Sequence, residues 1–261
     1  MISVVINTLN EEQNIKECIS SLKGFADEII VCDMYSEDNT VNIAHSLGAK
    51  IYYYEKTGYV EPARFYAITK ASCPWILILD ADERLTKELS MKLLELTKNN
   101  NELDLIKFAS LYNYFGKYVK HGGFFKNDWT RFFKKELYLS SYSEANTKIF
   151  QGLNNLTTNS ISSIQLSKDF YIIHEAYPTL SKYVEKTTSK YAYIEASQLF
   201  TSGKKVSLLN VIIEPVKSFL KKYILQLGFL DGAHGLILCC LYSIYRFNVN
   251  SILWDLNMRS K

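Results

Sequence analysis

The chain has 261 residues, of which 48% are hydrophobic, and a formal net charge of +3. A chain of this length can bury a sizeable core, and its small net charge, without a Lys/Arg-rich block among aromatic residues, argues against nucleic-acid binding. The five cysteines form no CxxC pair and the opening "MISVVINTLN" has no basic leader. We therefore expect reduced thiols and a cytoplasmic protein.

The first hundred residues alternate between strand-like and helix-like patterns. Apolar runs typical of strands covered on both faces are "ISVVIN", "EIIVCD", "AKIYYYE" and "WILILD". Apolar residues at helical spacing predict helices in "EEQNIKECISSL", "SEDNTVNIAHSLG" and "EPARFYAITKA". Thr86 is a suitable N-cap for a fourth helix, "KELSMKLLELTKN". The alternation predicts right-handed βαβ units and a parallel sheet.

The pattern changes after residue 102. Aromatic-rich, strand-like runs such as "LDLIKFASLYNYF" and "SKDFYIIHEAY" predict a mixed α+β half that extends the same sheet. From Thr179 onward the pattern is helical. We therefore expect one α/β domain over residues 1–178, with halves 1–102 and 103–178, and a helical region over residues 179–261.

Polar side chains follow three of the predicted strands. Thr8 and Asn10 leave the first strand, Asp33 ends the second, and Asp80 and Asp82 follow the fourth. Open parallel sheets bind their ligands beyond the carboxyl ends of the strands. We therefore expect these side chains to lie at one edge of the sheet.

Several common phosphate-binding and catalytic motifs are absent from the sequence. It has no G-x-G-x-x-G, no P-loop and no G-x-S-x-G, and its four histidines lack zinc spacing. An edge that carries aspartates but no glycine-rich loop favours a hard divalent cation, Mg²⁺ or Mn²⁺, which neutralises a diphosphate. The alternative for Asp82 and Glu83 is a solvated helix start, where acids favour the positive end of the helix dipole.

Seven segments occur in an order and spacing that identify a family. They are "SVVINTLNEEQNI", "EIIVCDMYSEDNT", "GYVEPARFYAI", "WILILDADE", "YFGKYVKHGG", "TRFFKK" and the tail "LKKYILQLGFLDGAHGLILCCLY". Together they resemble the family 2 glycosyltransferases of GT-A fold, and most closely the branch with bacterial lipopolysaccharide and lipooligosaccharide core β-1,4-glucosyltransferases. The resemblance implies a Rossmann-like, mostly parallel sheet with a mixed α+β acceptor half and a C-terminal helical extension.

The resemblance also implies a UDP-sugar donor, bound by residues 1–102. Thr8, Asn10 and Glu11 would line the nucleotide site, Asp33 would hold the base, and Arg64 would reach the nucleotide or diphosphate. The alternatives are a polar strand end with an N-cap and an arginine on a helix surface.

A divalent cation follows from the same resemblance. Asp80 and Asp82 would form the D-x-D pair, with Asp82 the more direct metal ligand, and His174 would be a third ligand. The alternative for His174 is a histidine at the rim of the core. Tyr35 stands where the family usually has glycine, so it must keep ordinary backbone angles or bear strain, and it is a candidate to stack on the base.

The resemblance places an arginine in a strand and an acid soon after it. Arg131 in "TRFFKK" and Glu144 in "SYSEANTK" match these positions, although Ser143 replaces the usual histidine. Glu144 would be the catalytic base of an inverting transfer, with Asp128 as the second candidate. The alternative for Glu144 is a solvated loop carboxylate.

These roles imply that a hexose, such as glucose, moves from a UDP-sugar to a bacterial envelope glycan, such as lipooligosaccharide core, with a β-glycosidic bond in the product. In "YFGKYVKHGGFF", Lys117 and Lys120 would face an anionic acceptor, or alternatively protect a strand edge. Two other functions stay open: a sugar-1-phosphate nucleotidyltransferase, and an inactive membrane-associated scaffold.

The C-terminal region combines lysines with long apolar stretches over residues 204–247. This pattern predicts helices that lie on the inner face of the bacterial cytoplasmic membrane as a peripheral attachment. A core helix, a dimer face and a spanning helix are the alternatives, and the oligomeric state is open.

Overall fold

The computed structural model describes residues 1–56, 60–99, 102–141 and 161–259, without the side chains of residues 127–129, 141 and 189. The chain forms two compact units: unit 1 comprises Met1–Ser110 and Lys126–His174, and unit 2 comprises Leu111–Phe125 and Glu175–Lys261. This division differs from the boundary predicted at residue 178, because residues 111–125 group with the C-terminal helices.

Unit 1 begins with four parallel strands. They are β1 (Ile2–Thr8), β2 (Glu28–Asp33), β3 (Lys50–Tyr53) and β4 (Trp75–Asp80). Strand β1 pairs with both β2 and β4, and all seven of its residues are buried. Burial on both faces explains why this strand reads as a continuous apolar run rather than as an alternating one.

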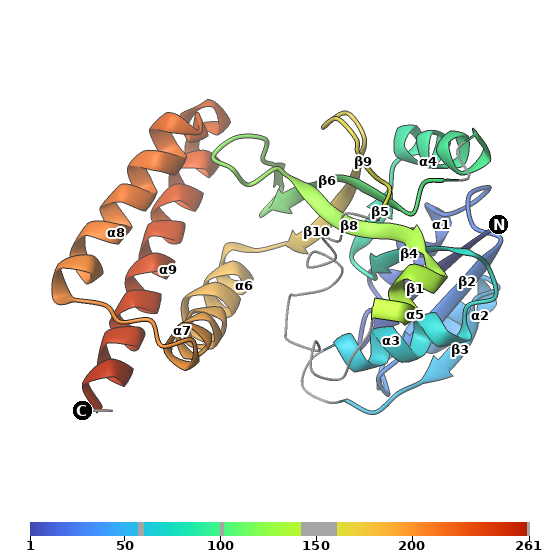
Figure 1. Ribbon diagram of the computed structural model, residues 1–261, viewed down its shortest axis with the longest axis horizontal. Coiled ribbons are helices and arrows are strands. Elements are labelled where there is room, and N and C mark those ends of the chain that lie inside the picture. Colours follow the sequence, from blue (N-terminus) through green and yellow to red (C-terminus); the bar gives the residue numbers. More distant parts are fainter. Residues whose placement is uncertain (57–59, 100–101, 142–160, 260–261) are drawn as a thin grey trace. The chain divides into compact units, whose positions relative to one another are not determined.

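The remaining strands make the sheet mixed (Figure 1). Strand β8 (Lys126–Lys134) is antiparallel to β4 and to β6 (Leu105–Tyr114). Strand β5 (Glu83–Leu85) is antiparallel to β10 (Tyr171–Tyr177), and β9 (Ser163–Gln165) is parallel to β6. The strand order is β3-β2-β1-β4-β8-β6-β10-β5. The predicted change from a parallel first part to a mixed second part is therefore confirmed.

Helices cover both faces of the sheet. On one face pack α1 (Ile15–Ser20), α2 (Thr40–Ser46) and α4 (Lys87–Asn99), and on the other pack α3 (Glu61–Lys70) and α5 (Lys135–Ser141). The predicted start of α4 is confirmed, since the Leu89 amide donates to Thr86 Oγ1 at 3.4 Å. Two apolar cores thus hold the strand ends in place from either side.

Unit 2 is mainly helical and has its own core. Its helical segments are α6 (Leu180–Val184), η3 (Glu185–Tyr191), α7 (Ala192–Thr201), α8 (Leu208–Leu220), η4 (Lys221–Leu225), η5 (Gly228–Asp231) and α9 (Gly232–Arg259). Helices α7 and α8 pack along α9. Strand β7 (Lys117–Tyr118) forms a hairpin with the end of β6, and Tyr114 of this hairpin stacks on Tyr177.

The start of η5 lies very close to the first turn of α9. A Cβ atom on Gly235 would lie 1.9 Å from the carbonyl oxygen of Gly228, so only glycine fits there.

The stretch Gly228–Arg259 is, within the described part of the chain, the one helical stretch whose length and composition would allow it to cross a membrane, and 28% of its most apolar window is buried.

Candidate active site

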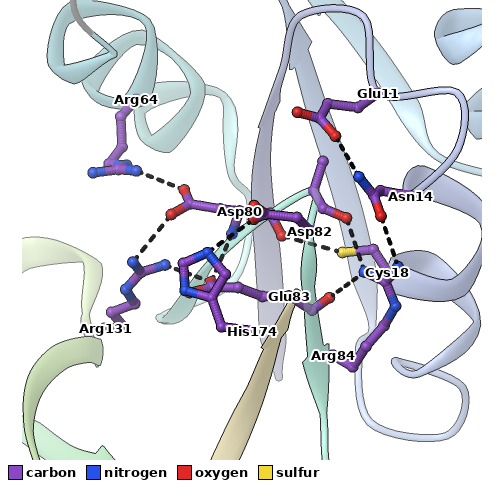
Figure 2. A network of polar contacts seen from close by, with 11 residues as sticks. Glu11, Asn14, Cys18, Arg64, Asp80, Asp82, Glu83, Arg84, Arg131 and His174 are labelled. Carbon is purple, nitrogen blue, oxygen red and sulfur yellow. Dashed lines mark hydrogen bonds and ion pairs between the residues drawn. The ribbon is translucent and has the colours of Figure 1, made fainter. Parts of the chain in front are cut away.

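The polar ends of three strands of unit 1 lie at one sheet edge. Asp80 is the register partner of Asn7, and Asp33 is the register partner of Thr8. Asp82 lies in the short turn between β4 and β5. The predicted convergence of the strand ends is found, and Figure 2 shows the network that Asp80 and Asp82 form with their neighbours.

Asp80 lies between two guanidinium groups. Its Oδ1 accepts a hydrogen bond from Arg64 Nη2 at 2.8 Å, and its Oδ2 accepts one from Arg131 Nη2 at 3.1 Å. Burial alone would raise the pKa of Asp80, but the charges of Arg131 and Arg64 outweigh burial and hold that pKa well below its usual range. Asp80 is therefore an anion whose charge the two arginines balance.

Glu83 is the buried centre of the network. Its Oε2 accepts hydrogen bonds from the Asp80 amide at 2.8 Å and from Arg131 Nη1 at 2.6 Å. Burial raises the pKa of Glu83 to about 7, and the charges of Asp80 and Asp82 add to this rise while Arg131 opposes it. Glu83 begins strand β5, so the solvated helix start considered for it is wrong.

Asp82 and His174 face each other across the network. Asp82 Oδ1 lies 3.2 Å from His174 Nε2, and His174 Nδ1 lies 3.3 Å from Glu83 Oε1. Burial would lower the pKa of His174, but Glu83 and Asp82 outweigh burial and raise it. His174 of β10 thus lies between two carboxylates, that of Asp82 in the turn after β4 and that of Glu83 at the start of β5.

Two of the three predicted metal ligands are therefore together. Asp82 and His174 offer one oxygen and one nitrogen, whereas Arg64 and Arg131 bind the two oxygens of Asp80. Within the described residues, no three His, Cys, Asp or Glu side chains form a cluster that could hold a metal ion. The expectation that Asp80 joins the other two as a ligand is thus not met in this structure.

Asp33 shapes the loop that follows β2. The side chain is fully buried, and it accepts hydrogen bonds from Thr8 Oγ1 at 2.7 Å and from the amide and hydroxyl of Ser36 at 2.7 and 2.6 Å. These hydrogen bonds fix the loop between residues 33 and 36. That Asp33 holds the base stays a prediction.

The loops after β1 and β2 each carry one residue with left-handed backbone angles. Asn10 has φ 57° and Tyr35 has φ 60°. Ser36 Oγ accepts from the Asn10 amide at 2.8 Å, and Asn10 Oδ1 accepts from the Glu37 amide at 2.8 Å. These hydrogen bonds hold Asn10 in its unusual conformation. Tyr35 adopts the left-handed conformation without being glycine, so its backbone is strained, as expected. Its exposed ring stacks on the ring of Tyr53, with the ring centroids 5.6 Å apart.

Glu11 connects the first loop to the turn between β4 and β5. Its Oε2 accepts from Asn14 Nδ2 at 2.8 Å, and Asn14 Oδ1 accepts from Arg84 Nη2 at 3.4 Å. Arg84 also donates to the carbonyl oxygen of Ala81 at 2.9 Å. The predicted nucleotide-lining residue thus braces the turn that carries Asp82 (Figure 2).

Asn7 and Ser36 belong to this edge but were not predicted from the sequence, and the role of Glu83 was left open. Asn7 is buried, and neither atom of its amide has a hydrogen-bond partner among the described residues. Its signal was a polar residue inside an otherwise apolar strand. The only sign of the buried role of Glu83 was its place directly after the D-x-D pair.

The two candidates for the catalytic base cannot be placed. Glu144 lies outside the described residues, and Asp128 belongs to β8 but its side chain is not described. Both stay predictions. Arg131, which the resemblance places in a strand, lies in β8, where it is buried and bridges Glu83 and Asp80.

Comparisons with known proteins support the same picture. Residues 3–152 match the family described as Glycosyl transferase family 2. An uncharacterized glycosyltransferase of Rickettsia bellii is 31% identical over 255 residues, which cover 94% of this chain and 83% of that protein.

Two solved structures share the fold. Glucosyl-3-phosphoglycerate synthase from Mycobacterium tuberculosis, in complex with Mn²⁺, UDP and glucosyl-3-phosphoglycerate, is 18% identical with a TM-score of 0.52, covering 79% of this chain and 81% of that chain. TarS 1–349 from S. aureus, in complex with UDP, is 17% identical with a TM-score of 0.52, covering 100% of this chain and 92% of that chain. The likeness confirms the predicted GT-A type of α/β fold.

Proposed function

The chain belongs to glycosyl transferase family 2 and is therefore an enzyme of the glycosyltransferase class, and from this premise we propose the reaction that it catalyses. The reaction is an inverting, metal-dependent transfer of a hexose, such as glucose, from a UDP-sugar to a bacterial envelope glycan, such as lipooligosaccharide core. The product carries a β-glycosidic bond. The observation that supports this proposal most directly is the pairing of Asp82 with His174 beside an Asp80 held by two arginines.

The donor atoms of the site suit a hard divalent cation. Asp82 supplies a carboxylate oxygen and His174 an imidazole nitrogen, 3.2 Å apart, and Mg²⁺ or Mn²⁺ takes its other ligands from diphosphate oxygens and water. Glu83 faces the second ring nitrogen of His174 at 3.3 Å, as carboxylates commonly do behind a ligating histidine. The residues therefore fit the cation. When bound, it offsets negative charge on the diphosphate of the donor.

The protein's own residues account for donor binding and charge stabilisation. Asp80 holds the Arg64 guanidinium at the strand end, with Arg64 Nη2 2.8 Å from Asp80 Oδ1. From there Arg64 would offset the charge that develops on the leaving diphosphate. Thr8, Asn10 and Glu11 line the nucleotide site, and Asp33 contributes to it by fixing the loop beneath.

Glu144 is the proposed base. Its carboxylate would take the proton of the acceptor hydroxyl as that oxygen attacks the anomeric carbon, and the bond to the diphosphate breaks on the opposite face. One such displacement converts the α-link of the donor into a β-link. Asp128 is the second candidate for this role.

The acceptor is a glycan or glycolipid that the enzyme meets at the inner face of the cytoplasmic membrane. Lys120 in the hairpin of unit 2 is exposed and suits an anionic acceptor, whereas Lys117 Nζ donates to the carbonyl oxygen of Asp231 at 2.7 Å. Lys117 therefore helps to hold the hairpin in place.

A titration of UDP into the full chain, with and without Mn²⁺, tests the proposal. We expect binding that depends on the metal, and we expect Asp82→Asn to weaken it at least ten-fold, as loss of a metal ligand would. Glu95→Gln, at an exposed position on α4, is the matched control and should bind as the wild type does. UDP binding that ignores both Mn²⁺ and Asp82→Asn would instead favour the inactive scaffold.

Turnover then identifies the donor. A panel of UDP-glucose, UDP-galactose and UDP-N-acetylhexosamines is assayed for metal-dependent hydrolysis, with Glu144→Gln alongside. We expect one donor to be preferred, and Glu144→Gln to abolish its hydrolysis while UDP still binds. A Glu144→Gln variant with full hydrolysis activity would move the role of base to Asp128.

A further inference from the structure

Unit 2 exposes an apolar stripe along one helix. Six side chains on α8 and η4 are between 46% and 65% exposed: Leu208, Leu209, Ile212, Val216, Leu220 and Ile224. We call these six residues the apolar face. Five of them recur at intervals of four residues, and positions four apart are neighbours on a helix surface. Val211 and Pro215 of the same helix are buried, and α8 packs against α9.

The exposed apolar surface continues into the turn after the apolar face. Leu225, Phe229 and Leu230 are 77%, 45% and 55% exposed. Large contiguous apolar patches are rare on soluble monomers, and they mark interaction sites. We therefore expect the apolar face of α8 to be covered by a binding partner.

Basic side chains border the apolar face. Lys204 and Lys205 are exposed just before α8, and the exposed Lys217 and Lys221 directly follow Val216 and Leu220. Consecutive residues of a helix are rotated by about 100° about its axis. Lys217 and Lys221 therefore lie along the edge of the apolar face.

Residues 204–247, which include the apolar face, carry a net positive charge. Residues 204–247 contain six basic side chains against two acidic ones, a net +4, which exceeds the net +3 of the whole chain. Of the two acidic residues, Asp231 is buried, and the Oε1 atom of Glu214 lies 3.8 Å from Lys217 Nζ. A second copy of the chain seated symmetrically on this face would bring lysines against lysines. An anionic bilayer surface neutralises them instead.

We propose that the apolar face, with Lys204, Lys205, Lys217 and Lys221 at its border, docks unit 2 on a bilayer that contains anionic phospholipid. Helix α8 lies in the plane of the interface, the six apolar side chains enter the boundary between headgroups and acyl chains, and the lysines contact lipid phosphates. The proposal deepens the proposed action on a membrane acceptor and rests on it for its purpose. The docking itself is measured without donor or acceptor.

Flotation of the full chain with vesicles tests the proposal. Vesicles of phosphatidylcholine alone are compared with vesicles that contain about one third phosphatidylglycerol, at low and high salt. We expect flotation with the anionic vesicles, and weaker flotation as salt rises, because screening reduces the attraction of the lysines.

Two pairs of matched variants separate the contributions of charge and apolar contact. Lys217→Ala with Lys221→Ala should weaken partitioning into anionic vesicles about 30-fold, whereas Lys16→Ala with Lys23→Ala, exposed lysines of unit 1, should leave it unchanged. Ile212→Glu with Val216→Glu should abolish flotation at any salt, whereas Met91→Glu, at a residue 56% exposed on α4, should not. Thermal unfolding confirms that each variant is folded.

Three outcomes would overturn the proposal. Absence of flotation, together with a concentration-dependent dimer that Ile212→Glu and Val216→Glu dissociate, would make the face a contact between copies. Flotation that is equal with and without anionic lipid would remove the role of the lysines. Resistance to alkaline carbonate would indicate a spanning helix. None of these results alters the Mn²⁺-dependent binding of UDP, so a failure of docking is distinct from a failure of the proposed function.

Discussion

Arg131 Nη1 lies 2.6 Å from Glu83 Oε2, and neither side chain is more than 8% exposed. Arg131 Nη2 at the same time donates to Asp80 Oδ2 at 3.1 Å. One buried cation thus holds two carboxylates at the end of β4. Because a buried charge without its partner is costly, the three residues act as a unit.

Replacement of Arg131 by alanine should therefore destabilise the fold. We expect Arg131→Ala to lower the free energy of unfolding by about 3 kcal/mol, because Glu83 and Asp80 lose their shared counter-charge. Arg131→Lys should recover part of this loss. Urea denaturation at pH 7 measures both, with Arg259→Ala as the control at an exposed ion pair, where we expect about 0.5 kcal/mol or less. An Arg131→Ala variant as stable as the wild type would show that the network tolerates the buried acids alone.

Asn7 should lower the stability of the fold and strengthen the binding of UDP. Its buried amide lacks hydrogen-bond partners among the described residues, and such groups cost about 1–3 kcal/mol each. We expect Asn7→Leu to raise the free energy of unfolding by about 1 kcal/mol and to weaken UDP binding, because the amide lies beside Asp80 in the sheet. Asn42→Leu, at an exposed position on α2, should change neither quantity. Calorimetry of unfolding and of UDP binding gives both values, and an Asn7→Leu variant with lower stability would contradict the prediction.

Tyr35 should contribute to binding of the base rather than to folding. Its ring is 60% exposed and already stacks on Tyr53. Stacking of a base on an aromatic side chain is worth about 1–3 kcal/mol, so we expect Tyr35→Ala to weaken UDP binding about ten-fold. Tyr35→Phe, which keeps the ring, should bind as the wild type does. Tyr193→Ala removes a ring that is 59% exposed in unit 2 and serves as the control; equal affinities for all three variants would exclude stacking on Tyr35.

Glu28 should make stability depend on pH in the acid range. Burial raises its pKa, but hydrogen bonds from Lys50, Ser3 and Ser72 outweigh burial and lower the pKa from 4.5 to about 2. A carboxyl whose pKa is lowered by folding stabilises the fold above the unfolded value of 4.5, and this stabilisation is lost as pH falls towards 2.

The matching measurement is urea unfolding of Glu28→Gln from pH 2 to pH 7. We expect the substitution to cost about 2 kcal/mol at pH 7 and close to nothing at pH 2. Glu95→Gln, whose carboxylate is 54% exposed, should follow the wild type at every pH. A constant difference between Glu28→Gln and the wild type across the range would assign the effect to packing.

The sequence alone was sufficient for the strands and helices whose patterns are strong. The apolar runs of β1, β2 and β4 are typical of buried strands, and the polar residues at their ends mark one edge of a parallel sheet. The C-terminal helices were predicted from the same kind of pattern. The division into two units was not, because the hairpin of residues 111–125 groups with helices that lie far away in sequence.

The site was only partly predictable, for a physical reason. A list of acids and bases does not say which of them pair, and here Asp80 pairs with arginines while Asp82 pairs with a histidine. Asp33 likewise ends a strand in the sequence, but the sequence does not show that it accepts hydrogen bonds from Thr8 and Ser36. Which side chains pair depends on burial and on strand register, and a single stretch of sequence shows neither.

The cysteines differ sharply in their accessibility. Cys18, Cys32, Cys73 and Cys239 are buried, and Cys240 on α9 is exposed. Burial also raises the pKa of Cys18, whose Sγ lies 3.6 Å from the carbonyl oxygen of Asp80. An alkylating fluorophore would therefore label a single thiol in unit 2 of the native enzyme, and its emission would report on the surroundings of the long helix while the catalytic edge stays chemically untouched.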